Sequence, residues 1–139
     1  MEEQSKINSM WQVAFIHWLV AGFLIPFVVF SLASLLWRSL GLSFITAEII
    51  DVALALLVLW LGVRFSISQM VRKYSGINLV EIAKLSLVYV IVVSGGARIY
   101  SLFYTTSFDL MLAINWVGFV LSTITFYLAT RKGYRVSIQ

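Results

Sequence analysis

The feature that most constrains the fold is a long apolar stretch without formal charge near the start of the chain. Residues 7–37 contain no Asp, Glu, Lys or Arg. A transmembrane helix needs about 20 mainly apolar residues to cross a hydrocarbon layer about 30 Å thick, so this stretch is long enough to span. Hydrophobic residues make up 61% of the chain and charged residues 12%, which excludes a soluble domain of 139 residues. The sequence therefore predicts an integral membrane protein.

Four apolar segments of spanning length follow one another along the chain. We expect transmembrane helices at roughly 11–36, 45–68, 83–106 and 109–130. The connections 38–44 and 104–109 are short, which places the first helix against the second and the third against the fourth. The expected fold is a single all-α domain over residues 1–139, a four-helix transmembrane bundle made of two helical hairpins.

The segment between the two predicted hairpins differs from the outer connections. Residues 68–85 form a longer, amphipathic stretch that contains the turn sequence KYSG, followed by Asn78 as a helix cap. Two interpretations fit it: a segment at the cytoplasmic interface with its basic residues near anionic headgroups, or a solvated connector.

Basic residues predict the orientation, because loops rich in Lys and Arg stay on the cytoplasmic side. One side of the predicted bundle carries Lys6, Arg72, Lys73, Lys84, Arg131, Lys132 and Arg135. The connections on the opposite side carry only Arg38. We therefore expect both termini in the cytoplasm. The net charge of +4 follows from this bias and indicates no nucleic acid partner.

Polar residues interrupt the second, third and fourth predicted helices at a similar depth. Asp51, Arg98 and Asn115 lie about six to eight residues from the outer ends of their helices, or roughly 9–12 Å down. Glu48 lies one turn above Asp51 on the same face. An isolated charge at the bilayer centre costs about 2.5–3.5 kcal/mol, so these side chains are expected to converge. We predict an ion pair between Asp51 and Arg98, with Asn115 hydrogen-bonded to it.

This outer polar cluster has two interpretations. In the functional one, it binds an anionic or polyhydroxylated group that enters from one face. Arg98 is then the charge ligand, because a planar guanidinium suits phosphate and carboxylate. In the structural one, Asp51 neutralises Arg98, the pair fixes the helix register, and Glu48 faces headgroups at the rim.

Two further polar residues lie toward the cytoplasmic ends of the helices. Arg64 is about one turn from the end of the second helix, so its long side chain reaches the interface by snorkelling. His17, in the inner half of the first helix, fits a hydrogen-bonded interior residue better than a proton relay. If His17 and Arg64 meet, they form a second, inner polar layer.

The two predicted hairpins carry similar short segments. WLVAGFL in the first helix and VVSGGARI in the third lie at corresponding places, and LGVRFSI and LATRKGY place an arginine at the exits of the second and fourth. This arrangement suggests an internal two-plus-two duplication, with chance similarity between apolar helices as the competing explanation. Pro26, the only proline, predicts a kink in the first helix.

Signatures of catalysis are missing. The chain has no cysteine and one histidine, and it lacks both metal-ligand spacing and a Gly-rich phosphate loop. We therefore expect a protein that is not an enzyme, with no cofactor and no metal. An ion channel would need a polar stripe through the full membrane depth, whereas this sequence has apolar residues between its polar layers.

A family resemblance rests on three segments: residues 19–50, GVRFS after the second helix, and the ending TFYLATRKGYRV. They resemble the GtrA-like family of small four-helix membrane proteins. The resemblance implies a role in cell-envelope polysaccharide or glycolipid assembly, with a polyprenyl-phosphate-linked sugar moved across, or presented at, the bacterial cytoplasmic membrane. By motif position, the resemblance implies that Arg64 and Arg131 are functional residues. GGARIYSL is also similar to a second bacterial four-helix family, which implies no activity.

The leading expectation is a small multi-pass translocase or carrier component, such as part of a flippase, for a lipid-linked anionic substrate. The alternative is a non-catalytic structural or assembly subunit of a larger membrane complex. The expected partners are membrane lipids, the polyprenyl-phosphate-linked sugar, and either further copies of the chain or other membrane subunits.

Overall fold

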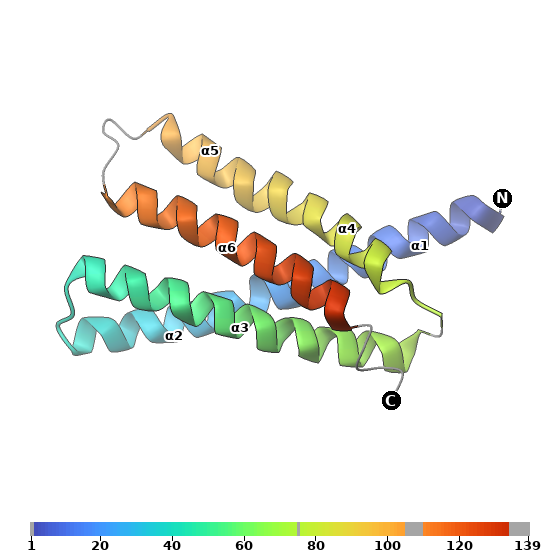
Figure 1. Ribbon diagram of the computed structural model, residues 1–139, viewed down its shortest axis with the longest axis horizontal. Helices are drawn as coiled ribbons and strands as arrows, with labels where there is room; N and C mark the ends of the chain where they lie inside the picture. The colour runs from blue at the N-terminus through green and yellow to red at the C-terminus, as the bar shows by residue number, and fades with distance from the viewer. Residues whose placement is uncertain (1, 75, 105–109, 134–139) are drawn as a thin grey trace.

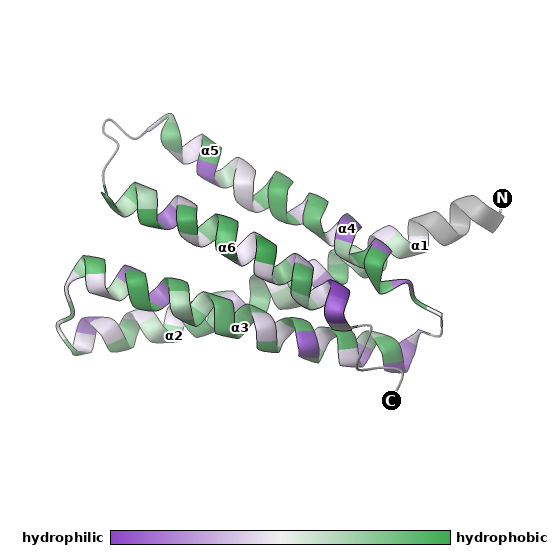
Figure 2. Ribbon diagram, viewed as in Figure 1, coloured by the Kyte–Doolittle hydropathy of each residue, from purple (hydrophilic) through white to green (hydrophobic). Residues whose placement is uncertain are grey.

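A computed structural model of the protein describes residues 2–74, 76–104 and 110–133, with the backbone alone for residues 2–8. Every element in this part of the chain is helical. Four helical runs are long and apolar enough to cross a membrane: Ser9–Ser39, Phe44–Lys73, Leu79–Leu102 and Leu110–Lys132. The expected class, an α-helical protein with four candidate membrane spans, is confirmed. Figure 2 shows hydrophobic residues along the length of all four runs.

Short π-helical segments divide two of the four spans. The first span consists of α1 (Glu2–His17), η1 (Trp18–Leu24) and α2 (Ile25–Ser39). The third consists of α4 (Leu79–Tyr89), η2 (Val90–Gly95) and α5 (Gly96–Leu102). The second and fourth are the uninterrupted helices α3 (Phe44–Lys73) and α6 (Leu110–Lys132). The π-helical segments therefore fall in the two spans that carry the similar segments WLVAGFL and VVSGGARI.

The sequence around each π-helical segment accounts for it. Pro26 has no backbone N–H, and its ring would crowd the carbonyl of Gly22 four residues earlier in an α-helix. A π turn pairs residues five apart and widens the helix there, as in the bond from the Ile25 N–H to the Val20 carbonyl. At the end of η2 a pair of glycines, 95 and 96, takes the place of the proline.

The spans form two packed pairs (Figure 1). α2 packs on α3, and α4 packs on α6, as the short outer connections predict. α3 and α6 join the two pairs along the bundle, and α1 packs on α4. The start of α1, the end of α6 and the connection from α3 to α4 lie at one end of the bundle (Figure 1).

The connection between the second and third spans is shorter than the expected stretch 68–85, because α3 and α4 both extend into it. Its apolar residues explain the difference, since Met70 and Ile82 are buried in the core. The predicted cap is present: the Asn78 side-chain oxygen accepts a hydrogen bond from the Val80 N–H at 3.1 Å.

The outer connection from α2 to α3 is a tight turn. Gly41 has a φ of 63°, a left-handed conformation that glycine adopts without strain. Ser43 then caps α3, because its hydroxyl oxygen accepts a hydrogen bond from the Thr46 N–H at 3.3 Å. In the second outer connection, residues 105–109 lie outside the described part of the chain.

Packing is tight in one half of the bundle and loose in the other. The half that holds the start of α1 and the end of α6 contains nearly all of the buried hydrophobic residues: Ala14, Trp18, Ala21, Val58, Leu59, Val63, Ile67, Met70, Leu79, Ile82, Ala83, Val90, Phe126 and Ala129. In the opposite half, which is called the outer half after the predicted orientation, only Ala33 joins them among the described residues, and α5 has no buried residue. The predicted outer polar cluster lies in this loosely packed half.

Candidate functional site

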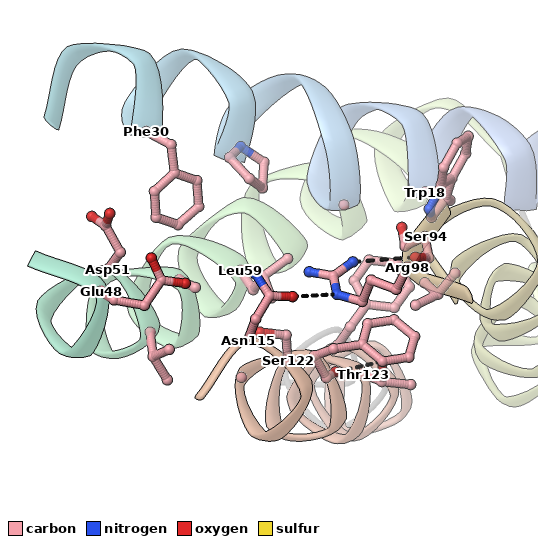
Figure 3. Close-up of a pocket in the computed structure, with 18 of the residues that line it drawn as sticks. Trp18, Phe30, Glu48, Asp51, Leu59, Ser94, Arg98, Asn115, Ser122 and Thr123 are labelled. Carbon is pink, nitrogen blue, oxygen red and sulfur yellow. Dashed lines mark hydrogen bonds between the residues drawn. The ribbon is translucent and has the colours of Figure 1, made fainter. Parts of the chain in front are cut away.

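A cavity of about 400 Å³ lies between the four spans in the outer half (Figure 3). All four residues of the predicted outer cluster line it: Glu48, Asp51, Arg98 and Asn115. The first span lines it with residues four positions apart, from Trp18 to Ser34, and therefore with one face of the helix. Counting residues from the helix ends thus placed these side chains around one space.

The cavity has an apolar floor and a polar mouth. Trp18, Leu59 and Phe126 line the floor and are buried. Ser34 and Asn115 line the mouth and are exposed. This change from polar to apolar along one cavity suits an amphiphilic ligand.

Arg98 is positioned by three groups of its own hairpin. Its Nε–H donates to Asn115 Oδ1 at 3.1 Å, so the predicted hydrogen bond between these residues is present. Its Nη1 donates to the carbonyl of Ser94, one turn earlier, at 3.2 Å. The guanidinium carbon lies 4.6 Å from the ring centroid of Phe119, a cation–π contact. Together these contacts fix the direction of the guanidinium (Figure 3).

The Arg98 guanidinium keeps hydrogen-bonding capacity for a ligand. It carries five N–H donors, of which the contacts to Asn115 and Ser94 use two. No described residue accepts from the other three. No buried side-chain nitrogen or oxygen among the described residues lacks a partner, so Nη2, which no described residue accepts from, is not fully buried, and Arg98 lines the cavity.

Asp51 does not pair with Arg98, contrary to our prediction. Its Oδ1 accepts a hydrogen bond from the Nε1–H of Trp37 at 2.8 Å. No ion pair within 4.0 Å joins Arg98 to Asp51 or to Glu48. The physical reason is that each charged side chain has a hydrogen-bond partner within its own hairpin: Asp51 bonds Trp37 on α2, and Arg98 bonds Asn115 on α6.

Glu48 is the second carboxylate that lines the cavity with Arg98. It accepts a hydrogen bond from no described residue. Figure 3 shows Glu48 and Asp51 together on α3, apart from the Arg98 guanidinium and its partner Asn115. The site therefore has an acidic wall and a basic wall that do not neutralise each other by direct contact.

His17 forms an inner polar layer with two hydroxyl groups. It is 0% exposed, its Nδ1 lies 2.8 Å from Ser66 Oγ, and its Nε2 lies 2.9 Å from Thr130 Oγ1. The Thr130 hydroxyl donates to the carbonyl of Phe126. The Thr130 oxygen therefore accepts from the Nε2–H of His17, and in the neutral imidazole Nδ1 then accepts from the Ser66 hydroxyl. The layer joins the first, second and fourth spans.

Arg64 takes no part in this inner layer. Residues two positions apart lie on nearly opposite helix faces, so Arg64 is exposed where Ser66 is buried against His17. Arg131, at the end of α6, is exposed as well. The two arginines that the family resemblance marks therefore lie outside the cavity.

Two residues of the site were not predicted from the sequence. Trp37 fits an interfacial aromatic, and its bond to Asp51 depends on how the turn at Gly41 aligns the two helices. Phe119 lies one turn from Asn115 on α6, so helical spacing indicates that any group bonded to Asn115 also meets this ring. Spacing was therefore a usable signal for Phe119 alone.

The described residues contain no group of three or more His, Cys, Asp and Glu side chains that could hold a metal ion. Comparison of the chain with known protein families, with curated protein sequences and with solved structures gave no match. The resemblance to the GtrA-like family stays a prediction, and the site is interpreted from its own geometry.

Proposed function

We propose that the protein is a membrane carrier component that binds the phosphate-bearing head of a lipid-linked substrate in the cavity between its spans. The observation that carries the proposal is the state of Arg98. Its guanidinium is held in place by Asn115, Ser94 and Phe119, yet Arg98 lines the cavity and keeps three N–H donors that no described residue uses. A phosphate group accepts such a planar fork through two parallel hydrogen bonds.

The polarity of the cavity supports a lipid rather than a small soluble anion. Its floor is apolar at mid-depth, and its charged residues lie toward one end of the bundle. A lipid in the leaflet on that side has the same arrangement, with its head near the surface and its chain toward the bilayer centre. The lipid therefore enters with its head beside the charged residues and its apolar chain beside the apolar floor.

We further propose a polyprenyl-phosphate-linked sugar as the substrate and the bacterial cytoplasmic membrane as the location, following the family resemblance. The last turns of α3 and α6 carry four basic residues, at the same end of the bundle as the start of α1: Arg72, Lys73, Arg131 and Lys132. The positive-inside rule supports both termini in the cytoplasm, with the cavity mouth toward the outer surface.

The test is lipid retention by the purified protein. The protein is extracted in a mild detergent, and native mass spectrometry measures the bound phospholipid and polyprenyl-phosphate species. We expect Arg98→Met and Asn115→Asp to lower retention about 10-fold or more, because each removes the free positive charge. Arg38→Met is the matched control, since this exposed arginine lies in the last turn of α2, near the same surface but outside the cavity.

Circular dichroism and gel filtration establish that the variants remain folded. Retention in folded Arg98→Met equal to that of the natural protein would overturn the proposal. Stoichiometric co-purification of another membrane protein, with no phosphate-bearing lipid bound, would favour the alternative of an assembly subunit.

A further inference from the structure

The two charged walls of the cavity are held apart rather than joined. Trp37 retains Asp51 on one side, and Asn115 with Ser94 retains Arg98 on the other. Glu48 lies on the same helix as Asp51, one turn nearer the outer end. A ligand between the walls therefore meets a cation on one side and two carboxylates on the other.

The acidic wall has unused acceptors. A carboxylate offers about four lone-pair sites. Glu48 uses none of them with a described residue, and Asp51 uses one with Trp37. A purely anionic headgroup would satisfy Arg98 but would lie beside two like charges, which disfavour it. Only a headgroup that also carries a positive charge satisfies both walls.

We infer that the cavity selects a zwitterionic amphiphile, in which a phosphate group meets Arg98 and a protonated amine lies between Glu48 and Asp51. The inference rests on the proposed function, since it names the class of lipid that the same cavity takes. A protonated amine joined to the phosphate through a short carbon linker or a sugar fits a space of about 400 Å³. The apolar chain lies toward Trp18 and Phe126 at the floor.

The experiment compares two lipid probes that share the phosphodiester and differ in the headgroup attached to it, an amine in one and hydroxyl groups in the other. Phosphatidylethanolamine and phosphatidylglycerol with identical acyl chains share the phosphodiester, but only the first carries an amine. Both are titrated onto delipidated protein in detergent and followed by native mass spectrometry. We expect phosphatidylethanolamine to bind at least about 10-fold more tightly. A lower or equal affinity would overturn the inference.

Glu48→Gln is the decisive variant, because Glu48 has no described hydrogen-bond partner and its neutralisation breaks no internal contact. We expect the preference for the amine to fall several-fold, and to vanish in Glu48→Gln with Asp51→Asn. Glu81→Gln, an exposed carboxylate in the first turn of α4, is the matched control. An unchanged preference in Glu48→Gln would overturn the inference.

Arg98→Met separates this inference from the proposed function. If both lipids bind equally and both are lost in Arg98→Met, the amine selection fails while the phosphate site stands. If both are retained in Arg98→Met, both proposals fail. Millimolar phosphoethanolamine, the soluble headgroup, should not displace the bound lipid; displacement would overturn the assignment of an amphiphile and indicate a soluble ligand.

Discussion

Trp37 and Asp51, on neighbouring spans, are joined by a hydrogen bond of 2.8 Å between the indole N–H and a carboxylate oxygen. The bond ties the outer end of α2 to α3 and retains the half-buried carboxylate on its own hairpin. Arg98 is retained in the same way by Asn115 on the second hairpin. The opposite charges therefore face each other across a space that a ligand can enter.

Trp37→Phe removes the indole donor but keeps an aromatic ring. We expect it to lower the free energy of unfolding by about 1–2 kcal/mol, because the Asp51 carboxylate loses its charge-assisted partner. Unfolding in a denaturing detergent measures the change, and Trp60→Phe on the exposed surface of α3 is the control. The double variant Trp37→Phe with Asp51→Asn should lose less stability than the two single variants lose in sum. Strict additivity of the two losses would contradict the hydrogen bond.

The sequence predicted the class of the protein and the depth of the site. It did not predict which side chains pair within the site. Apolar length predicts the spans because bilayer thickness sets it. Depth counting placed Asp51, Arg98 and Asn115 in one layer because the rise per residue is constant. The partner of each charge depends instead on helix rotation and on the separation of the hairpins, which packing such as that of Gly118 against Val52 determines.

The π-helical segments and the inner layer show a second limit. The correspondence between WLVAGFL and VVSGGARI was visible, but a pattern with the α-helical period carries no sign of a turn that holds one residue more. His17 was expected to be a hydrogen-bonded interior residue, as it is. Its partners Ser66 and Thr130 could not be chosen, because serines and threonines occur on many faces of these spans.

The inner layer provides a second prediction. Ser66→Ala leaves Nδ1 of His17 without a donor, and Thr130→Val leaves Nε2–H without an acceptor. We expect each change to lower the free energy of unfolding by about 0.6–1.7 kcal/mol, from the average to the maximum found for hydrogen bonds between membrane helices. Thermal unfolding in detergent reports the loss as a lower midpoint temperature.

Ser68→Ala is the matched control for Ser66→Ala. It lies two residues away on the exposed face, where its hydroxyl bonds only the carbonyl of Phe65. We expect its midpoint temperature to stay close to that of the natural protein. Equal midpoints for Ser66→Ala and Ser68→Ala would contradict the buried contact with His17.

A third prediction concerns the contact between α3 and α6 beside the cavity. A Cβ atom at Gly118 would lie 2.9 Å from Cγ2 of Val52, too close for ordinary packing. Gly118→Ala should therefore destabilise the bundle by about 1–3 kcal/mol. Gly96→Ala, with nothing within 4 Å of the added atom, should be neutral or slightly stabilising.

The clash also has a specific rescue. Val52→Ala removes the methyl groups that the new side chain would meet, so Gly118→Ala with Val52→Ala should recover part of the lost stability. Unfolding of the four proteins of this cycle in detergent gives the coupling between the two positions. The absence of any coupling would mean that α3 and α6 do not approach each other at this point.

The last prediction treats η2 as an α-helix with one residue inserted. A π turn holds one residue more than an α turn, so deletion of the exposed Val92 should restore an α turn and leave α5 in place. Arg98→Cys with Asn115→Cys reports the placement by thiol cross-linking, since the chain has no cysteine of its own. The cross-link should persist after this deletion.

Deletion of exposed Val120 in the uninterrupted α6 is the control. This deletion should abolish the cross-link, because one missing residue rotates the rest of the helix by about 100°. If both deletions abolish the cross-link, the wide turn of η2 is not an insertion but sets the direction of α5.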